Sequence, residues 1–148
     1  MAIKVLELHH QGVRIDADDK TIQDLKNFYS GVLGLEHDTG RPEIPGIPGM
    51  WINIGEVGQI HLIGGDLPSR FAQGPGKDPT VPHVALAVEN IVETKAELDR
   101  LGADYWSLKG ATGPDAEQLF LNDPCGNMVE LHQYDKCRCR LKSRVKTA

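Results

Sequence analysis

Four residues that can ligate a metal stand at matching positions in two halves of the sequence. They are three histidines and one glutamate: His10, His61, His83 and Glu130. His83 follows His10 by 73 residues and Glu130 follows His61 by 69 residues, so both pairs have nearly the same spacing. Imidazoles and carboxylates are ligands of divalent zinc, nickel, iron, manganese and cobalt. If the two halves fold alike about a pseudo-twofold axis, the four side chains meet, and the sequence predicts one such ion among them.

Each of these residues also has a plain structural interpretation. A single inward-facing histidine is more often a hydrogen-bonded core residue than a metal ligand. In the segment 119–132, LFLNDPCGNMVELH, a turn at Asp123 and Gly126 separates two short strands, and alternation puts Glu130 and His132 on one face. An unpaired carboxylate inside a sheet is costly. Three histidines and this glutamate at repeat-matched positions therefore favour the metal hypothesis.

The first half of the chain is predicted to be a strand, a helix and three further strands. Residues 5–15 form the first strand, in which His10 and Arg14 share one face. A threonine with an acid three residues on predicts a helix start at Thr21, and the helix ends near Gly34. The three further strands are expected at 35–39, 50–54 and 59–63, with a Gly- and Pro-rich loop over 40–49.

After a Gly- and Pro-rich connection the same pattern begins again. The strand VPHVALAV at 81–88 matches the first one, with His83 in the place of His10. Asn90 caps a helix that Gly102 ends. Strands follow at 104–108, 117–121 and 127–133. The sequence thus predicts an α+β fold of two tandem βαβββ modules that form a half-open barrel in a single domain. Its expected parts are module one at about 3–64, a linker at about 65–80, module two at about 81–134 and a basic tail at 135–148.

Composition and charge narrow the function classes. A chain of 148 residues with 40% hydrophobic and 25% charged residues suits one soluble domain. The sequence has no apolar run of membrane-spanning length and no signal-peptide layout, so we expect a cytoplasmic protein without a membrane partner. The net charge is −5, although six of the sixteen basic residues lie in the tail. An acidic body without a nucleic-acid motif argues against nucleic-acid binding, and the tail is expected to be a solvated terminus.

The cysteines predict neither a disulfide framework nor a structural zinc site. There are three of them, Cys125, Cys137 and Cys139. The number is odd, and the close pair Cys137 and Cys139 has no second pair of cysteines or histidines at zinc-binding spacing.

Five motifs in residues 5–134 resemble the vicinal oxygen chelate superfamily: HHQGVRI, LKNFYSGVLGLE, GQIHLI, PHVALAV and LNDPCGNMVELHQ. That superfamily contains glyoxalase I, extradiol dioxygenases, methylmalonyl-CoA epimerase, fosfomycin-resistance enzymes and bleomycin-binding proteins. The resemblance implies metal ligands at His10, His83 and Glu130. It places His61 where glyoxalase I has a glutamate and the epimerase a glutamine. It also implies a homodimer with one metal ion that holds two oxygens of a substrate.

The resemblance implies a metal-dependent lyase or isomerase, similar to glyoxalase I, that acts on a small oxygenated and anionic molecule. Glu130 and His61 are then the candidate catalytic residues, because either could carry the proton. A non-haem iron dioxygenase is the second hypothesis, since His10, His83 and Glu130 alone form a set of two histidines and one carboxylate. A bleomycin-resistance-type binding protein and a fosfomycin-type thiol transferase are further alternatives.

Substrate contacts are predicted at five further residues: Arg14, Trp51, Asn53, Phe120 and His132. Arg14 is expected to pair a carboxylate or phosphate, or to form a salt bridge inside the barrel. Trp51 and Phe120 are expected as pocket walls, although core packing explains them equally well. The remaining residues of interest are expected to be structural or solvated: His9 on the opposite strand face from His10, His37, and Arg41 in the 40–49 loop.

Overall fold

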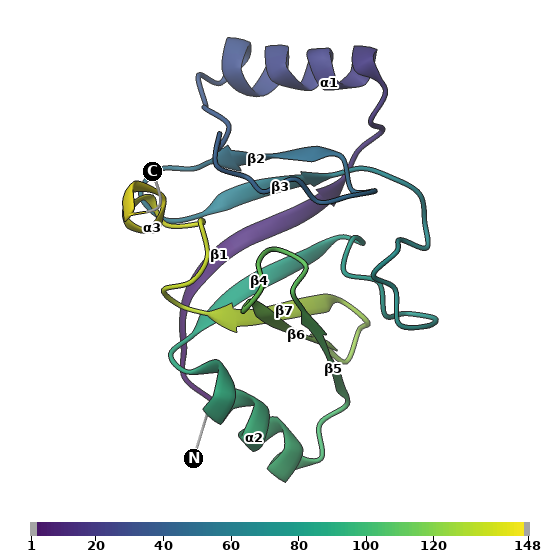
Figure 1. Cartoon of the computed structure of the whole chain (residues 1–148), viewed down its shortest axis with the longest axis vertical. Helices are drawn as coiled ribbons and strands as arrows, with labels where there is room; N and C mark the ends of the chain where they lie inside the picture. The colour runs from purple at the N-terminus through teal and green to yellow at the C-terminus, as the bar shows by residue number, and fades with distance from the viewer. Residues whose placement is uncertain (1–2, 147–148) are drawn as a thin grey trace.

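The structure is a computed structural model that describes residues 3–146. One mixed seven-stranded sheet runs through the molecule in the order β2-β3-β1-β4-β7-β6-β5 (Figure 1). Its strands are β1 (Val5–Arg14), β2 (Gly49–Asn53), β3 (Gln59–Ile63), β4 (His83–Val88), β5 (Tyr105–Lys109), β6 (Glu117–Asn122) and β7 (Met128–Gln133). The predicted α+β fold class is confirmed.

The sheet pairing repeats in the two halves. β1 pairs with β3 in parallel, and β4 pairs with β7 in parallel, so the first strand of each half lies beside its last strand. The halves join through the antiparallel pair β1 and β4 at the middle of the sheet. This junction sets Gly12 of β1 opposite His61 on one side and opposite His83 on the other. The candidate ligands therefore lie on neighbouring central strands.

Two helices cover the two halves. α1 (Asp19–Lys26) continues as a π-helical turn, η1 (Asn27–Val32), and lies at one end of the molecule, whereas α2 (Ile91–Leu101) lies at the other (Figure 1). Asn90 caps α2 by accepting from the Glu93 N–H, and Gly102 ends it in a left-handed conformation. α1 begins earlier than predicted, because Asp18 and not Thr21 is the cap: its carboxylate accepts from the Thr21 N–H at 2.9 Å.

The strand predicted at 35–39 is not formed as a regular strand. Only an isolated bridge joins His37 to Ile52, with hydrogen bonds from the Asp38 N–H to the Trp51 carbonyl and from the Asn53 N–H to the Glu36 carbonyl. The segment is short because the Gly- and Pro-rich loop begins directly after it. The first half therefore contributes three strands to the sheet and the second half four.

The basic tail is packed against the body, so its prediction as a solvated terminus is wrong up to residue 144. A short helix, α3 (Leu141–Lys146), ends the described chain, and the Gly58 N–H donates to the Cys139 carbonyl at 2.9 Å. Charge pairing explains the docking: Arg138 donates to the buried Asp38 carboxylate through two nitrogens, at 2.9 and 2.8 Å. Arg144, also buried, donates to the carbonyls of Arg138 and Cys139. The tail thereby brings two cysteines to the centre of the sheet.

Within residues 3–146, every helix is too short or too polar to cross a lipid bilayer.

Candidate metal centre and substrate cavity

Three of the four predicted ligands converge on one point. The Nε2 atoms of His10 and His83 are 3.2 Å apart, and each lies 3.5 Å from Oε1 of Glu130. Ligand atoms bound at about 2.0–2.1 Å to one ion are separated by about 3.0–3.4 Å. All three side chains are buried. We call these residues the His10–His83–Glu130 triangle; its donor set and spacing fit a divalent metal ion.

In both His10 and His83, Nδ1 contacts a neighbouring group and Nε2 faces the triangle. His83 Nδ1 lies 2.8 Å from the Val81 carbonyl, which can only accept, so Nδ1 carries the proton and Nε2 keeps its lone pair. His10 Nδ1 lies 3.4 Å from the Cys139 sulfur. A partner on the second ring nitrogen is the usual way in which proteins orient a metal-binding histidine.

Glu130 is an ionised carboxylate surrounded by imidazoles. Oε1 faces the triangle and accepts from Gln118 Nε2 at 3.2 Å, and Oε2 lies 2.7 Å from His132 Nδ1. Burial alone would raise the pKa of Glu130, but His10, His132 and His83 together hold it well below its ordinary value. The negative charge is therefore available for a cation.

Gly12 leaves the space that the His83 ring fills. A Cβ atom at Gly12 would stand 2.6 Å from His83 Cε1, too close for any real contact. The backbone of β1 cannot retreat easily, because Gly12 lies between β3 and β4 in the sheet. A side chain at position 12 would therefore displace His83 from the triangle.

We expect Gly12→Ala to weaken divalent metal binding by about 10- to 100-fold, the effect typical of misorienting a ligand histidine. Titration calorimetry with zinc would measure it. Gly31→Ala is the matched control, because nothing lies within 4 Å of a Cβ built at Gly31. Equal affinities in both variants would show that His83 does not need the space.

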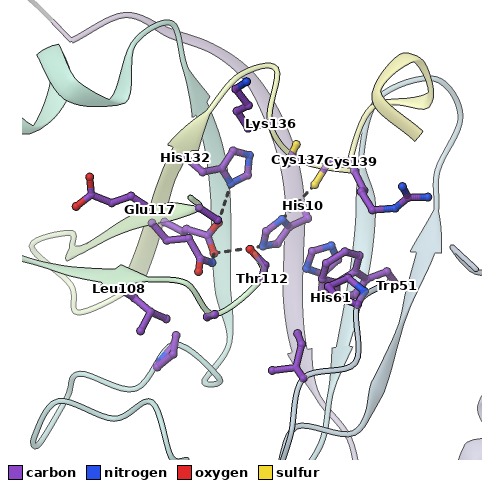
Figure 2. Close-up of a pocket in the computed structure, with 18 of the residues that line it drawn as sticks. His10, Trp51, His61, Leu108, Thr112, Glu117, His132, Lys136, Cys137 and Cys139 are labelled. Carbon is purple, nitrogen blue, oxygen red and sulfur yellow. Dashed lines mark hydrogen bonds and ion pairs between the residues drawn. The ribbon is translucent and has the colours of Figure 1, made fainter. Parts of the chain in front are cut away.

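His61 lies beside the triangle but does not point into it. Its ring stacks on His10 at 3.7 Å between centroids and on Trp51 at 4.4 Å, both nearly parallel (Figure 2). Lone pairs in stacked rings lie in nearly parallel planes, so His61 and His10 would bind one ion only after a ring rotation, although one ligand atom each of His61, His10 and Cys139 lies within 4.8 Å of the others. His61 Nε2 instead lies 2.8 Å from Oε1 of Gln59. Burial lowers the pKa of His61 well below its ordinary value, and the neighbouring His10 lowers it further.

Of the five predicted substrate contacts, Trp51 and His132 line the cavity and the other three make contacts elsewhere. Arg14 donates to the backbone carbonyls of Gly64, Gly65 and Thr80 in the connection between the halves. Asn53 accepts from Gln59 at 2.9 Å, away from the cavity lining. Phe120 is fully buried in a cluster with Trp106. The Phe120 and His83 rings meet edge to face, with 6.1 Å between their centroids, so Phe120 packs against a residue of the triangle.

His9 and His132 meet, although regular pleating predicts His9 on the far face of β1. Between the pairs Leu8↔Leu86 and His10↔Ala85, β1 advances by two residues while β4 advances by one, so β1 has a β-bulge here. Both His9 and His10 are consequently buried, and His9 Nδ1 lies 2.8 Å from His132 Nε2. The prediction that His9 faces away is wrong for this reason. His37 is exposed, as expected.

A cavity of about 490 Å³ opens onto the triangle. Its lining combines apolar residues with a few polar ones, and Figure 2 shows His10, His61 and His132 grouped inside it, with Cys137 and Cys139 close by. Arg41 reaches this cavity and lies over the Trp51 ring at 5.7 Å, whereas Lys136 is exposed at its edge. The arginines and lysine in the cavity lining are thus Arg41, Lys136 and Arg138, and Arg14 is not among them.

Two features of the site were missed from the sequence. Cys137 and Cys139 gave no usable signal, because they lie in a turn segment whose docking depends on contacts with distant residues such as Asp38. Gln118 gave no signal: its side chain lies beside Glu130, and its Oε1 is buried without a partner among the described residues.

A comparison with models of known protein families shows the family of this chain. Residues 9–131 match the model of the Glyoxalase/Bleomycin resistance protein/Dioxygenase superfamily. The chain belongs to this superfamily. The match includes His10, His61, His83 and Glu130, and the resemblance found in the sequence motifs is confirmed.

Individual members of the superfamily are only distantly similar. A relative from Arabidopsis thaliana named Glyoxylase I 4 is 29% identical over 121 residues, which cover 81% of this chain and 66% of that protein. A hypothetical protein from Bacillus halodurans C-125 has a similar structure, with 26% identity, a TM-score of 0.62 and coverage of 86% and 93% of the two chains. Methylmalonyl-CoA epimerase from Mycobacterium tuberculosis shares the fold at 21% identity, with a TM-score of 0.61 over 90% and 91%.

Proposed function

We propose that the protein is a metal-dependent lyase or isomerase, similar to glyoxalase I, that acts on a small oxygenated anion. The convergence of His10 Nε2, His83 Nε2 and Glu130 Oε1 within 3.5 Å of one another carries this proposal. These residues would hold a zinc, nickel, iron, manganese or cobalt ion, which supplies Lewis acidity toward substrate oxygens when bound. Relatives named as glyoxalase and epimerase support a lyase or isomerase.

His61 is the better placed of the two candidate proton acceptors. The Gln59 amide donates to Asn53 and Asp38, which fixes its oxygen toward His61 and the proton of His61 on Nε2. Nδ1 of His61 therefore has a free lone pair, and the low pKa keeps the ring neutral near pH 7. Glu130, by contrast, already uses both oxygens.

The cavity supports a small substrate with a negative charge. A volume of about 490 Å³ suits a metabolite or a small cofactor-linked group. Arg41 belongs to the cavity lining and lies over the Trp51 ring, so its guanidinium is a candidate partner for a carboxylate or phosphate. The Trp51 face forms the wall between this cation and His61.

A non-haem iron dioxygenase is the second candidate, and one observation favours it. With His61 turned toward Gln59, the triangle is a set of two histidines and one carboxylate, which iron(II) oxygenases use. Oxygen consumption that depends on added iron(II) would support this candidate. Turnover under nitrogen with nickel, zinc or cobalt would support the lyase.

Metal content tests the proposal directly. Protein purified without chelator or histidine tag should carry metal, and His83→Ala should lose the metal of the triangle. His37→Ala is the matched control, because His37 is exposed.

Deuterium exchange from solvent into α-hydroxycarbonyl compounds, followed by proton NMR, would report the proposed proton transfer. If the wild-type chain binds no metal even after reloading, the result supports the alternative of a binding protein of the bleomycin-resistance kind. Turnover only with an added thiol would instead identify a thiol transferase.

We also propose a homodimer. Leu6, Leu8 and Val84 are exposed on the adjoining strands β1 and β4, and Leu8 has 62% of its surface accessible. Covering such apolar side chains would favour association. Sedimentation equilibrium should give twice the chain mass of 16.2 kDa.

A further inference from the structure

We propose that His9, His132, Cys137 and Cys139 form a second metal site, of the closed zinc type, next to the triangle. One nitrogen or sulfur atom of each residue lies within 4.8 Å of all the others. The proposal does not rest on the proposed function, because none of the four residues belongs to the triangle. It differs from the expectation, drawn from the cysteine spacing, that a structural zinc site is absent.

The four atoms are close enough together to bind one tetrahedral ion after a small adjustment. Zinc bonds of about 2.0–2.1 Å to nitrogen and 2.3 Å to sulfur separate ligand atoms by about 3.3–3.8 Å. Here Nδ1 of His9 lies 2.8 Å from Nε2 of His132 and 2.8 Å from the Cys137 sulfur. These contacts need to widen by less than about 1 Å to receive the ion.

In each of the two histidines one ring nitrogen, here called the outer nitrogen, contacts a carboxylate. The other, here called the inner nitrogen, faces the proposed ion. His9 Nε2 lies 2.8 Å from a Glu7 carboxylate oxygen, and His132 Nδ1 lies 2.7 Å from Glu130 Oε2. Carboxylates accept, so the ring protons belong on these outer nitrogens. If both rings were neutral, the two inner nitrogens would face each other at 2.8 Å with lone pairs on both, so either a proton on His132 or a metal ion lies between them.

Carboxylate, histidine and metal in a row is a common arrangement at zinc sites. Here it occurs twice, once through Glu7 and once through Glu130. Two thiols complete the set, and thiolates select zinc over magnesium, calcium or manganese. A set of two cysteines and two histidines fills all four positions of zinc, so this site would be structural.

The bulge in β1 and the docked tail are the two features that create the site. The bulge turns His9 inward beside His10, and the tail places Cys137 and Cys139 over the central strands. His9 and His132 come from β1 and β7, so an ion there would fasten the tail to both halves of the sheet. Glu130 would then serve both sites, with Oε1 toward the triangle and Oε2 toward His132.

Zinc stoichiometry and a sulfur signature test the site separately from the triangle. We expect two zinc ions per wild-type chain and one in His83→Ala. We expect none when Cys137→Ser and Cys139→Ser are added to His83→Ala. Cys125→Ser is the matched control, because Cys125 is exposed and outside the cluster. In His83→Ala, the zinc X-ray absorption spectrum should show sulfur neighbours at about 2.3 Å.

A second measurement uses a single substitution in the otherwise wild-type chain. Cobalt(II)-loaded wild-type protein should show thiolate-to-cobalt charge-transfer absorption, which Cys137→Ser should reduce and Cys125→Ser should leave unchanged. Zinc without sulfur neighbours in both wild type and His83→Ala would overturn the proposal, as would zinc content that is unaffected by loss of both thiols. A sulfur signature combined with no effect of His83→Ala would support this site and contradict the triangle.

Discussion

Glu130→Gln is expected to reduce divalent metal affinity at the triangle by more than about 100-fold and to abolish turnover, since even indirect partners of metal ligands are worth 10- to 100-fold. Glutamine preserves the shape of the side chain and removes its charge. Glu130 is the carboxylate that lies within 3.5 Å of both His10 Nε2 and His83 Nε2. Without it, two neutral imidazoles would have to hold the ion alone.

The side-chain amide adds a second penalty. At the position of Oε1 its NH₂ group would face the donating amide of Gln118, and at the position of Oε2 it would face the protonated nitrogen of His132. Neither orientation satisfies all neighbours, because an amide has one acceptor end where the carboxylate has two. The loss should therefore appear in metal affinity as well as in catalysis.

Glu117→Gln is the matched control, and metal-binding calorimetry is the measurement. Glu117 lines the same cavity, but its carboxylate accepts from Lys95 at 2.9 Å and Ser107 at 2.6 Å, away from the triangle. We expect Glu117→Gln to bind metal like the wild type. Wild-type affinity in Glu130→Gln would contradict the assignment of Glu130 as a ligand.

The repeat in the sequence predicted the fold class and the meeting of four side chains, three of which converge in the structure. His10 and Glu130 both lie opposite Ala85, because β4 pairs with β1 in antiparallel and with β7 in parallel, and His83 lies on β4 itself. The helix-capping residues in the sequence also predicted the position of α2 between Asn90 and Gly102. These features depend on alternation, capping and turn chemistry, which are properties of short segments.

The features that the sequence did not predict depend on contacts between distant segments. The bulge that turns His9 inward arises from the register between β1 and β4, and no residue type announces it. Arg14 binds carbonyls of the connection between the halves, which lie 50 or more residues away. The orientation of His61 depends on Gln59, whose amide is fixed in turn by Asp38 and Asn53. Alternation alone indicated only the strand face of His61.

Arg138→Ala is expected to lower the free energy of unfolding by about 2–3 kcal/mol near pH 7, because it removes charged hydrogen bonds and leaves a buried carboxylate without its cation. Asp38 has only 2% of its side chain exposed, and Arg138 contacts both of its oxygens. Gly40 fits beneath this pair: a Cβ at Gly40 would overlap the Arg138 guanidinium. Chemical denaturation would measure the loss.

The effect of Arg138→Ala should depend on pH in a defined direction. Burial alone would raise the pKa of Asp38, but Arg138, the Gly40 N–H and Gln59 lower it below its ordinary value of 3.8. A carboxylate whose pKa is lower in the folded chain stabilises the fold above the unfolded pKa, and this contribution disappears as the pH falls through the folded pKa. The difference between wild type and Arg138→Ala should therefore be constant near neutrality and shrink below about pH 4.

The matched control is Arg100→Ala. Arg100 pairs with Glu97 one helical turn away on α2, and 63% of the Arg100 side chain is exposed. Exposed pairs of this kind contribute little, so no measurable change in stability is expected. If Arg138→Ala were equally harmless, the tail would be held by its backbone contacts and by the residues around Cys137 and Cys139. Loss of stability with Arg138→Ala would instead show that the ion pair with Asp38 holds the tail over the site, where its cysteines lie close to His9 and His10.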